Sequence, residues 1–140
     1  MQAEDINMED LIPQRDPVVV VGRLISAHGH TTITEFKVRD DHLFVSDGHL
    51  QESGLIENIA QTAAALNGYQ ARLQGGEVRK GFIGGIKNLR IIFLPAVGST
   101  ITTKVTEEHN VMDTSIIKGE VSLDGRLAAS CEMKVFLNTV

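Results

Sequence analysis

The chain has 140 residues, of which 42% are hydrophobic and 22% charged, and its net charge is -5 at neutral pH. This length suits one globular domain over residues 1–140, and the composition excludes a disordered chain. The acidic balance, without a run of Lys or Arg, excludes the charge footprint of a nucleic-acid-binding protein. With no long apolar run, no leader and a single cysteine, Cys131, we expect a soluble cytoplasmic protein without membrane contact.

The first part of the chain is predicted to form a hairpin. Residues 7–17 allow a short helical turn between prolines. Residues 18–27 are rich in β-branched side chains and residues 31–39 alternate, so the two segments predict strands joined by a turn at "HGH". Residues 42–45 are predicted to form a short extended segment. The hydrophobic pattern after it has the period of a helix.

A single helix is predicted from Gly54, with Ser53 as its N-cap and fraying near 74–76. Apolar side chains cover more than half of its circumference: Leu55, Ile56, Ile59, Ala60, Ala63, Ala64 and Leu66. A helix that is apolar over so wide an arc must be buried by something wrapped around it.

Four further segments have strand character: 81–93, 99–109, 114–123 and 126–137. Asp124-Gly125 predicts a tight hairpin between the last two. Strands segregated around one helix define the α+β class. The order therefore predicts a hotdog fold, a curved antiparallel β-sheet wrapped around one long central helix.

Glu57 and Gln61 are the polar residues that stand out on this helix. They are four positions apart and so lie on one face. A carboxyl group in a wrapped helix can serve as a general acid toward a departing hydroxyl. A glutamate near a helix N-terminus is also an ordinary structural residue, stabilised by the helix dipole, and the pattern leaves both interpretations open.

His49 precedes Glu57 by eight residues, in the loop that leads into the helix. Imidazole is the usual proton acceptor near neutral pH, and the free N–H groups of a helix N-terminus can hold an oxyanion. Base, acid and oxyanion donors could therefore converge here, although a histidine in a surface loop often has no function. The five histidines show no metal-ligand spacing, and no metal site is predicted.

Gly84 and Gly85 interrupt a predicted strand. Glycine within a strand marks either close approach of a ligand or backbone, or a simple bulge. Both interpretations stay open. Cys131 falls on the apolar face of the last strand and is predicted to be inert core.

The order of motifs resembles the β-hydroxyacyl-acyl-carrier-protein dehydratase family of hotdog proteins over nearly the whole chain. The resembling segments are "LIPQRDPVVVVGRL", "GLIENIAQTAAAL", "GFIGGIKNLRIIFLPAVGSTI" and "LDGRLAASCEMKVF". The helix segment carries an E-x-x-A-Q signature at Glu57, Ala60 and Gln61. The compact form of the helix and its preceding loop looks most like the short-loop dehydratase-like proteins of aryl polyene and flexirubin pigment clusters.

This resemblance implies dehydration of 3-hydroxyacyl thioesters on acyl carrier protein to trans-2-enoyl thioesters, without a cofactor, in fatty-acid-like or polyene biosynthesis. It implies catalysis by Glu57 as acid and His49 as base, with Gln61 holding the acid or the nearby backbone in place. The residues expected to contact substrate are Gly54, Gln61, Gly84 and Gly85. Those expected to dock the acyl carrier protein are Arg72, Arg79 and Lys80.

The family typically forms a homodimer whose sites lie between subunits, with histidine and acid from different chains. We expect a homodimer, or a hetero-oligomer with a second hotdog subunit. The chain departs from the family in its shortened "GHLQESG" loop and in Gln14, which stands where the family has histidine. Either His49 still reaches the site, or Leu43 occupies the position of the family's histidine.

Two other functions stay open. An acyl thioesterase would use Glu57 to activate water. A non-catalytic or partner-dependent hotdog subunit would bind acyl carrier protein and turn over only with its partner, and the shortened loop motivates this alternative.

Overall fold

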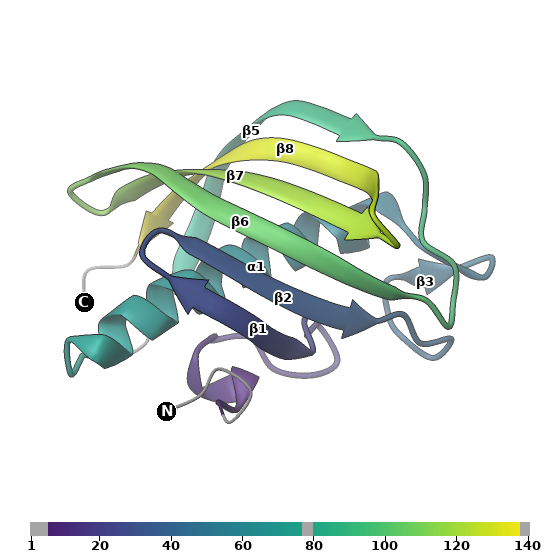
Figure 1. The fold of residues 1–140 in the computed structure, drawn as a ribbon, viewed down its shortest axis with the longest axis horizontal. Helices are drawn as coiled ribbons and strands as arrows, with labels where there is room; N and C mark the ends of the chain where they lie inside the picture. The colour runs from purple at the N-terminus through teal and green to yellow at the C-terminus, as the bar shows by residue number, and fades with distance from the viewer. Residues whose placement is uncertain (1–5, 77–79, 138–140) are drawn as a thin grey trace.

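The computed structural model describes residues 6–76 and 80–137. Six strands form one antiparallel sheet in the order β1-β2-β6-β7-β8-β5. Their bounds are β1 Arg23–His28, β2 Thr31–Lys37, β5 Gly81–Ile91, β6 Thr100–Val111, β7 Thr114–Leu123 and β8 Arg126–Leu137. The sheet curves around the single long helix α1, Glu52–Leu73, as Figure 1 shows. The α+β hotdog prediction is confirmed.

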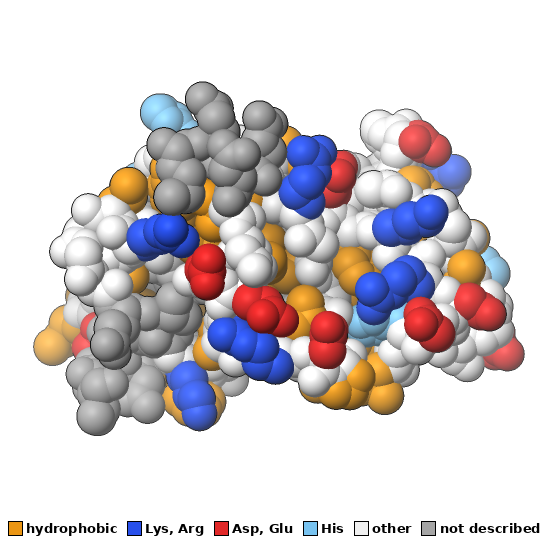
Figure 2. All heavy atoms as spheres, turned by 90° about the horizontal axis from the view of Figure 1, so that it is seen from below, with side chains coloured by type: hydrophobic (Ala, Val, Ile, Leu, Met, Phe, Trp, Pro, Cys, Tyr) orange, Lys and Arg blue, Asp and Glu red, His pale blue; other side chains and the backbone are white. Residues whose placement is uncertain are grey.

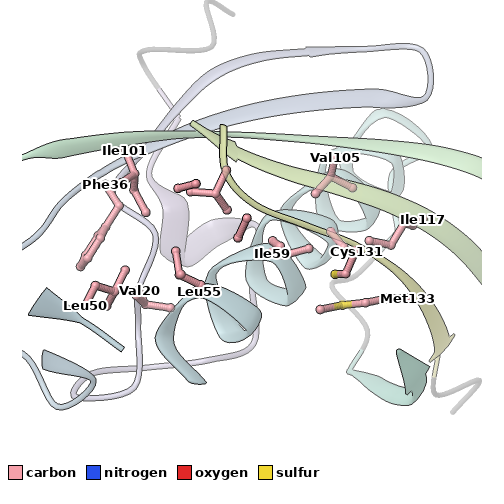
Figure 3. Close-up of a cluster of buried hydrophobic side chains, with 14 of the residues drawn as sticks. Val20, Phe36, Leu50, Leu55, Ile59, Ile101, Val105, Ile117, Cys131 and Met133 are labelled. Atoms are coloured by element: carbon pink, nitrogen blue, oxygen red, sulfur yellow. The ribbon is translucent and has the colours of Figure 1, made fainter. Parts of the chain in front are cut away.

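The core lies between α1 and the concave face of the sheet. Leu55 and Ile59 of the helix point toward the sheet side chains Phe36, Ile101 and Val105 (Figure 3). These residues are almost fully buried, and their burial is the main free-energy gain that holds helix to sheet. The two faces predicted by alternation, 32–38 on β2 and 127–137 on β8, both point inward.

The predicted bounds of β7 and β8 are confirmed, and those of β2, β5 and β6 are correct within two residues. The strand predicted over 18–27 is shorter, because β1 begins only at Arg23. Residues 18–20 instead bond to side-chain amides of α1, where the N–H of Val20 and the carbonyls of Val18 and Val20 find their partners. Because these backbone N–H and C=O groups already bond to side chains, they do not pair with a neighbouring strand.

A small hairpin was not predicted. β3, Val45–Ser46, pairs with β4, His49–Leu50, through Asp47 and Gly48, whose φ angles are 54° and 74°. Asp-Gly is the same signal that correctly predicts the turn at Asp124-Gly125, but the flanking strands here are too short to show alternation.

The start of the helix differs from the prediction, and its end agrees with it. α1 begins at Glu52 with Gln51 as N-cap, so Ser53 lies in the first turn and the predicted Ser53 cap is wrong. At the other end Gly75 has φ +74°, a conformation that glycine adopts without steric cost, and Gly76 donates its N–H to the carbonyl of Ala71.

The N-terminal segment covers the side of α1 that faces away from the sheet (Figure 1). A 3₁₀ turn, Met8–Asp10, leads into Leu11 and Ile12, which are buried in a second apolar cluster with Ala65. At the crossing the helix has Gly68, where a Cβ atom would lie 1.9 Å from the carbonyl oxygen of Leu11. The predicted short helical turn over 7–17 is confirmed.

A buried polar network fixes α1 against the sheet. Asn58 donates to the Val20 carbonyl at 2.8 Å and accepts from Thr103 of β6, while Thr62 donates to the Asn58 carbonyl and bonds to Thr34 of β2. Such bonds need one relative placement of helix and strands, and so the network sets the register of α1.

β5 is an edge strand with apolar side chains on its surface. It pairs with β8 alone, and its exposed hydrophobic residues include Phe82, Ile83, Ile86 and Leu89. Natural proteins seldom leave such an edge uncovered, because unpaired N–H and C=O groups beside apolar side chains attract another strand.

Cys131 is buried in the core as predicted, and burial, assisted by the neighbouring Glu132, raises the pKa of its thiol from 9.0 to about 11. We expect an aqueous disulfide reagent to label it only after denaturation. Because the folded state holds the thiol proton more tightly, its stabilising contribution is complete below pH 9 and is lost as the pH rises toward about 11. Urea melts across this pH range, compared with those of Cys131→Ala, check the expectation.

Candidate active site

Glu57 lies in the second turn of α1 and lines a cavity of about 250 Å³. The cavity is bounded by one face of the helix, by the first residues of β5 and by the end of β8. Its lining includes Ala60, Ala64 and Asn67 of the helix, together with Gly81, Phe82, Ile83, Val135, Leu137 and Gln14. The side chain of Glu57 is partly buried, and it lines this open hollow beside mainly apolar side chains.

Gln61 fixes the carboxyl group of Glu57. Its amide nitrogen donates to Glu57 Oε1 at 3.0 Å and to the Val18 carbonyl at 3.0 Å, and its amide oxygen accepts from the Val20 N–H at 2.8 Å. The Val20 bond determines which end of the amide faces the acid, since only the oxygen can accept. Both parts of the predicted role, holding acid and backbone, coincide in this one side chain.

The arrangement leaves the other carboxyl oxygen available. Oε1 accepts the hydrogen bond from the Gln61 amide, and an oxygen that accepts this bond is a poor site for a proton. A proton on the carboxyl group therefore belongs on Oε2. A carboxyl group with one oxygen held and the other free can deliver a proton in a fixed direction.

We expect Gln61→Met to lower turnover as well as stability. Without the amide, the Val20 N–H and Val18 carbonyl lose their partners, which costs about 3 kcal/mol of unfolding free energy, and the Glu57 carboxyl group loses its orientation. Urea melts measure the first effect, and kcat per folded molecule measures the second. An unchanged kcat beside a lower stability would reduce Gln61 to a structural residue.

The structure does not place His49 beside Glu57. His49 is exposed on β4, its Nδ1 bonds to the Asp47 carbonyl at 2.8 Å, and it is absent from the lining of the Glu57 cavity. Its assignment as the base therefore stays a prediction, and the two residues do not meet within one chain.

His42, which no sequence pattern singled out, is buried, and both of its ring nitrogens form hydrogen bonds. Nε2 donates to the Val19 carbonyl at 2.7 Å, and Nδ1 accepts the Phe44 N–H at 3.1 Å. The ring packs edge-on to Phe36 and stacks on Phe44. With both ring nitrogens bonded, His42 ties the loop before α1 to the core and has no nitrogen left for a substrate. The neighbouring Leu43 is exposed.

Of the three glycines predicted to contact substrate, Gly54 and Gly84 are tightly packed and Gly85 is not. A Cβ atom on Gly54 would approach Leu50 to 2.5 Å, and one on Gly84 would approach the Phe136 ring to 2.0 Å. Gly85 follows a register shift in the pairing of β5 with β8, so a β-bulge is present. Gly84 and Gly85 line a different hollow from that of Glu57. Substrate contact at these positions stays a prediction.

Of the residues predicted to dock a carrier, Arg72 is exposed and lies 3.9 Å from Asp10, and Lys80 borders a shallow hollow beside Gln14. Arg79 lies outside the described residues. Figure 2 shows Lys and Arg side chains interspersed with Asp and Glu over the viewed face. Mixed charges of this kind give no broad basic patch on that face, and docking by these residues stays a prediction.

Within the described residues, no group of histidine, cysteine and carboxylate side chains has a metal-binding arrangement, and no helix is long and apolar enough to cross a bilayer. Among the described residues, Glu107 is the acid that is buried. Its Oε2 accepts a hydrogen bond from the Ser115 hydroxyl at 2.8 Å, and its Oε1 lies 3.1 Å from His30 Nδ1. Both oxygens are therefore used in contacts between strand ends.

Gln14 and Asn67 are cavity residues that sequence reasoning missed. The amide oxygen of Gln14 is buried without a hydrogen-bond partner among the described residues. Its departure from the family's histidine was the signal available in the sequence. Asn67 lies ten residues after Glu57 on the same helix face, so helical spacing alone could have found it.

The curved sheet around one long helix defines a hotdog protein, and Glu57 on that helix lines its cavity. The chain is 18% identical to a chain of the dehydratase heterocomplex ApeI:P from Xenorhabdus doucetiae, with a TM-score of 0.90 over 96% of this chain and 92% of that one. It is also similar in fold to a hypothetical thioesterase crystallised with coenzyme A from Streptococcus pneumoniae, with 11% identity and a TM-score of 0.68 over 83% and 84% of the two chains.

In sequence, the 3-hydroxyacyl-[acyl-carrier-protein] dehydratase FabZ of Burkholderia mallei is 27% identical to this chain, over 99% of this chain and 97% of its own length. The family model of the ApeP dehydratase matches residues 6–139. The chain belongs to the ApeP-like dehydratase family, as its resemblance to the aryl polyene proteins predicted.

Proposed function

We propose that this dehydratase removes water from a 3-hydroxyacyl thioester carried by acyl carrier protein, giving the 2-enoyl thioester, and that it does so beside a second hotdog subunit. The observation that carries the proposal is the Glu57 carboxyl group, held by Gln61 and facing a largely apolar cavity. The FabZ relatives are 3-hydroxyacyl-[acyl-carrier-protein] dehydratases, and the similar ApeI:P dehydratase is a heterocomplex.

The elimination needs one acid and one base. A base takes a proton from C2, the C2–H electron pair forms the C2=C3 double bond, and the C3–O bond breaks. Glu57 protonates the departing oxygen, so that water leaves and the carboxylate is left behind. The acid is then restored by the proton that the base has taken.

We infer that the base comes from another chain. No histidine lines the Glu57 cavity, His42 has both nitrogens occupied, and His49 lies outside it. The residues of the first turn of α1 are likewise absent from the cavity lining. We propose that a second subunit supplies both the base and the N–H groups that bind the thioester oxygen.

The edge of β5 is the natural place for that subunit. Gly81, Phe82 and Ile83 line the cavity and also form part of the uncovered edge strand. A partner strand paired there would cover the apolar side chains and stand directly beside Glu57. This chain then supplies the acid of one site. A pair of hotdog subunits could hold a second site, with the acid on the partner and the base on this chain. In that site the base would have to be the tethered His42 or the exposed His49.

The test mixes this chain with hotdog proteins of the same cell, and follows loss of water from a 3-hydroxyacyl carrier thioester by mass. We expect little turnover from this chain alone and full turnover with one partner, at one active site per pair. Full turnover by the chain alone would overturn the need for a partner. Release of free thiol in place of water would show hydrolysis and overturn dehydration.

A further inference from the structure

The amide oxygen of Gln14 is a buried acceptor without a donor among the described residues. One other buried side-chain atom of the described chain is in the same position, the hydroxyl oxygen of Thr32, but Thr32 lies in β2 and outside the lining of the Glu57 cavity. Gln14 and Glu57 line that cavity together. A buried acceptor without a hydrogen bond is unfavourable, and a bound ligand that brings a donor relieves the cost.

The N-terminal segment brings Gln14 to the part of α1 that carries the acid. The segment runs in the direction opposite to the helix, passing Gly68 first and Gln61 later, where the Val18 carbonyl accepts the Gln61 amide at 3.0 Å. Gln14 lies between these two contacts. Because Gln61 also holds Glu57, this course places Gln14 beside the helix turns that carry the acid and its support.

Hydrogen bonds hold the backbone around Gln14 in place. The guanidinium group of Arg15 donates to the Gln14 carbonyl at 2.7 Å and to the Ile12 carbonyl at 2.8 Å. It also donates to the Glu9 carbonyl at 3.0 Å, and the Arg15 carbonyl accepts the Val18 N–H at 3.2 Å. The side chain of Gln14 therefore starts from a fixed point, and little backbone freedom is lost when a ligand bonds to it.

The leaving hydroxyl group of the proposed substrate needs an acceptor as well as an acid. Its oxygen takes the proton from Glu57, while its own hydrogen has to bond to another group. Gln61 presents its amide nitrogen to the acid and its amide oxygen to the Val20 N–H, so it offers no acceptor at that place.

The described lining of the cavity contains two other polar side chains, Gln14 and Asn67. Asn67 lies ten residues after Glu57 along the helix, about 15 Å away, which is too far for one hydroxyl group to bond to both. The unpaired oxygen of Gln14 is therefore the side-chain acceptor that this cavity offers to the leaving group.

We propose that Gln14 accepts the hydrogen of the substrate's 3-hydroxyl group and so directs a lone pair of that oxygen toward Glu57, an inference that rests on the proposed function. Glu57 transfers its proton, the C3–O bond breaks and the oxygen leaves as water, while Gln14 neither gains nor loses a proton. The oxygen becomes a stronger donor as it is protonated, so the bond to Gln14 stabilises the transition state more than the bound substrate. The 2-enoyl product has no hydroxyl group and forms no such bond.

Gln14→Met removes the amide and keeps the length of the side chain. The first measurement is the affinity of the assembled enzyme for two loaded carriers, one bearing a 3-hydroxyacyl group and one the saturated acyl group of the same length, each joined through a non-hydrolysable amide. We expect Gln14→Met to bind the 3-hydroxyacyl carrier about five-fold more weakly, as for one lost hydrogen bond, and the saturated carrier as before. In Gln14→His a neutral imidazole can accept the same bond, and most of the affinity should return.

The second measurement is kcat for dehydration, which should fall about ten-fold in Gln14→Met because the bond is strongest in the transition state. Urea melts of the same variant should show no loss of stability, since the substitution removes a buried acceptor that has no partner in the described chain. The control is Gln74→Met, the same change in an exposed side chain outside the lining of the Glu57 cavity, and it should alter none of the three quantities.

An equal fall in affinity for both carriers would make Gln14 a packing residue, and an unchanged affinity for both would place the hydroxyl group elsewhere. Either result overturns the proposal, as does a marked loss of stability in Gln14→Met, which would show that the fold itself uses the amide. None of these results affects the proposed dehydration. A wild-type assembly that prefers the 3-hydroxyacyl carrier through Gln14 but forms no enoyl product would contradict the dehydration and leave the contact with the hydroxyl group supported.

Discussion

We expect Glu57→Gln to lower the dehydration rate of the assembled enzyme by about 10²- to 10⁴-fold, the usual contribution of a positioned acid. Glutamine keeps the size of the side chain and can still accept the bond from Gln61, so the helix and its contacts should be preserved. The measurement is kcat, followed by mass on the carrier-bound substrate, since binding of the substrate should change far less.

The matched control is Glu52→Gln, which removes the same charge from the exposed first turn of the same helix. It should leave kcat unchanged. Comparable turnover in Glu57→Gln and wild type would remove Glu57 from the chemistry, and with it the main support for the proposed function.

A large loss of stability is also expected from Gly68→Ala. The added Cβ atom would lie 1.9 Å from the carbonyl oxygen of Leu11 and 2.7 Å from its carbonyl carbon, so backbone atoms must move to admit it. Overpacking of this kind costs about 3 kcal/mol, and because Leu11 belongs to the buried N-terminal cluster, the whole segment would be displaced from α1. Urea unfolding measures the difference.

Gly85→Ala provides the control for Gly68→Ala, because a Cβ atom at Gly85 meets nothing within 4 Å. We expect no loss of stability there, which also makes the variant suitable for testing the predicted substrate contact of Gly85. If Gly68→Ala unfolds at the wild-type urea concentration, the N-terminal segment does not lie against the helix as the structure has it.

Most of the fold could be predicted because each element carries a local signal. β2 and β8 alternate, α1 is apolar over a wide arc, and the turn before β8 contains Asp-Gly. The prediction failed where tertiary partners replace local ones. Residues 18–20 read as a strand from their β-branched side chains, but Asn58 and Gln61 of the helix satisfy their backbone.

The candidate site could be predicted only in part. Glu57 and Gln61 share a helix face, and helical geometry fixes that relation whatever surrounds it. His49 is close to Glu57 in the sequence but outside its cavity, because a loop has no fixed geometry and the β3–β4 hairpin directs it to solvent. Gln14 is distant in the sequence and reaches the cavity only because the N-terminal segment crosses α1.

The sequence by itself determined the class of fold, the helix that carries the acid, and the pairing of that acid with Gln61, since these depend on periodicity and on neighbours within one element. The tertiary structure decided which histidines are buried, where the cavity lies, and that the described lining of this cavity combines the acid with the edge strand β5 and with no histidine. Such features arise from contacts between segments far apart in the chain, whose geometry is set by how helix and sheet pack and not by any local pattern.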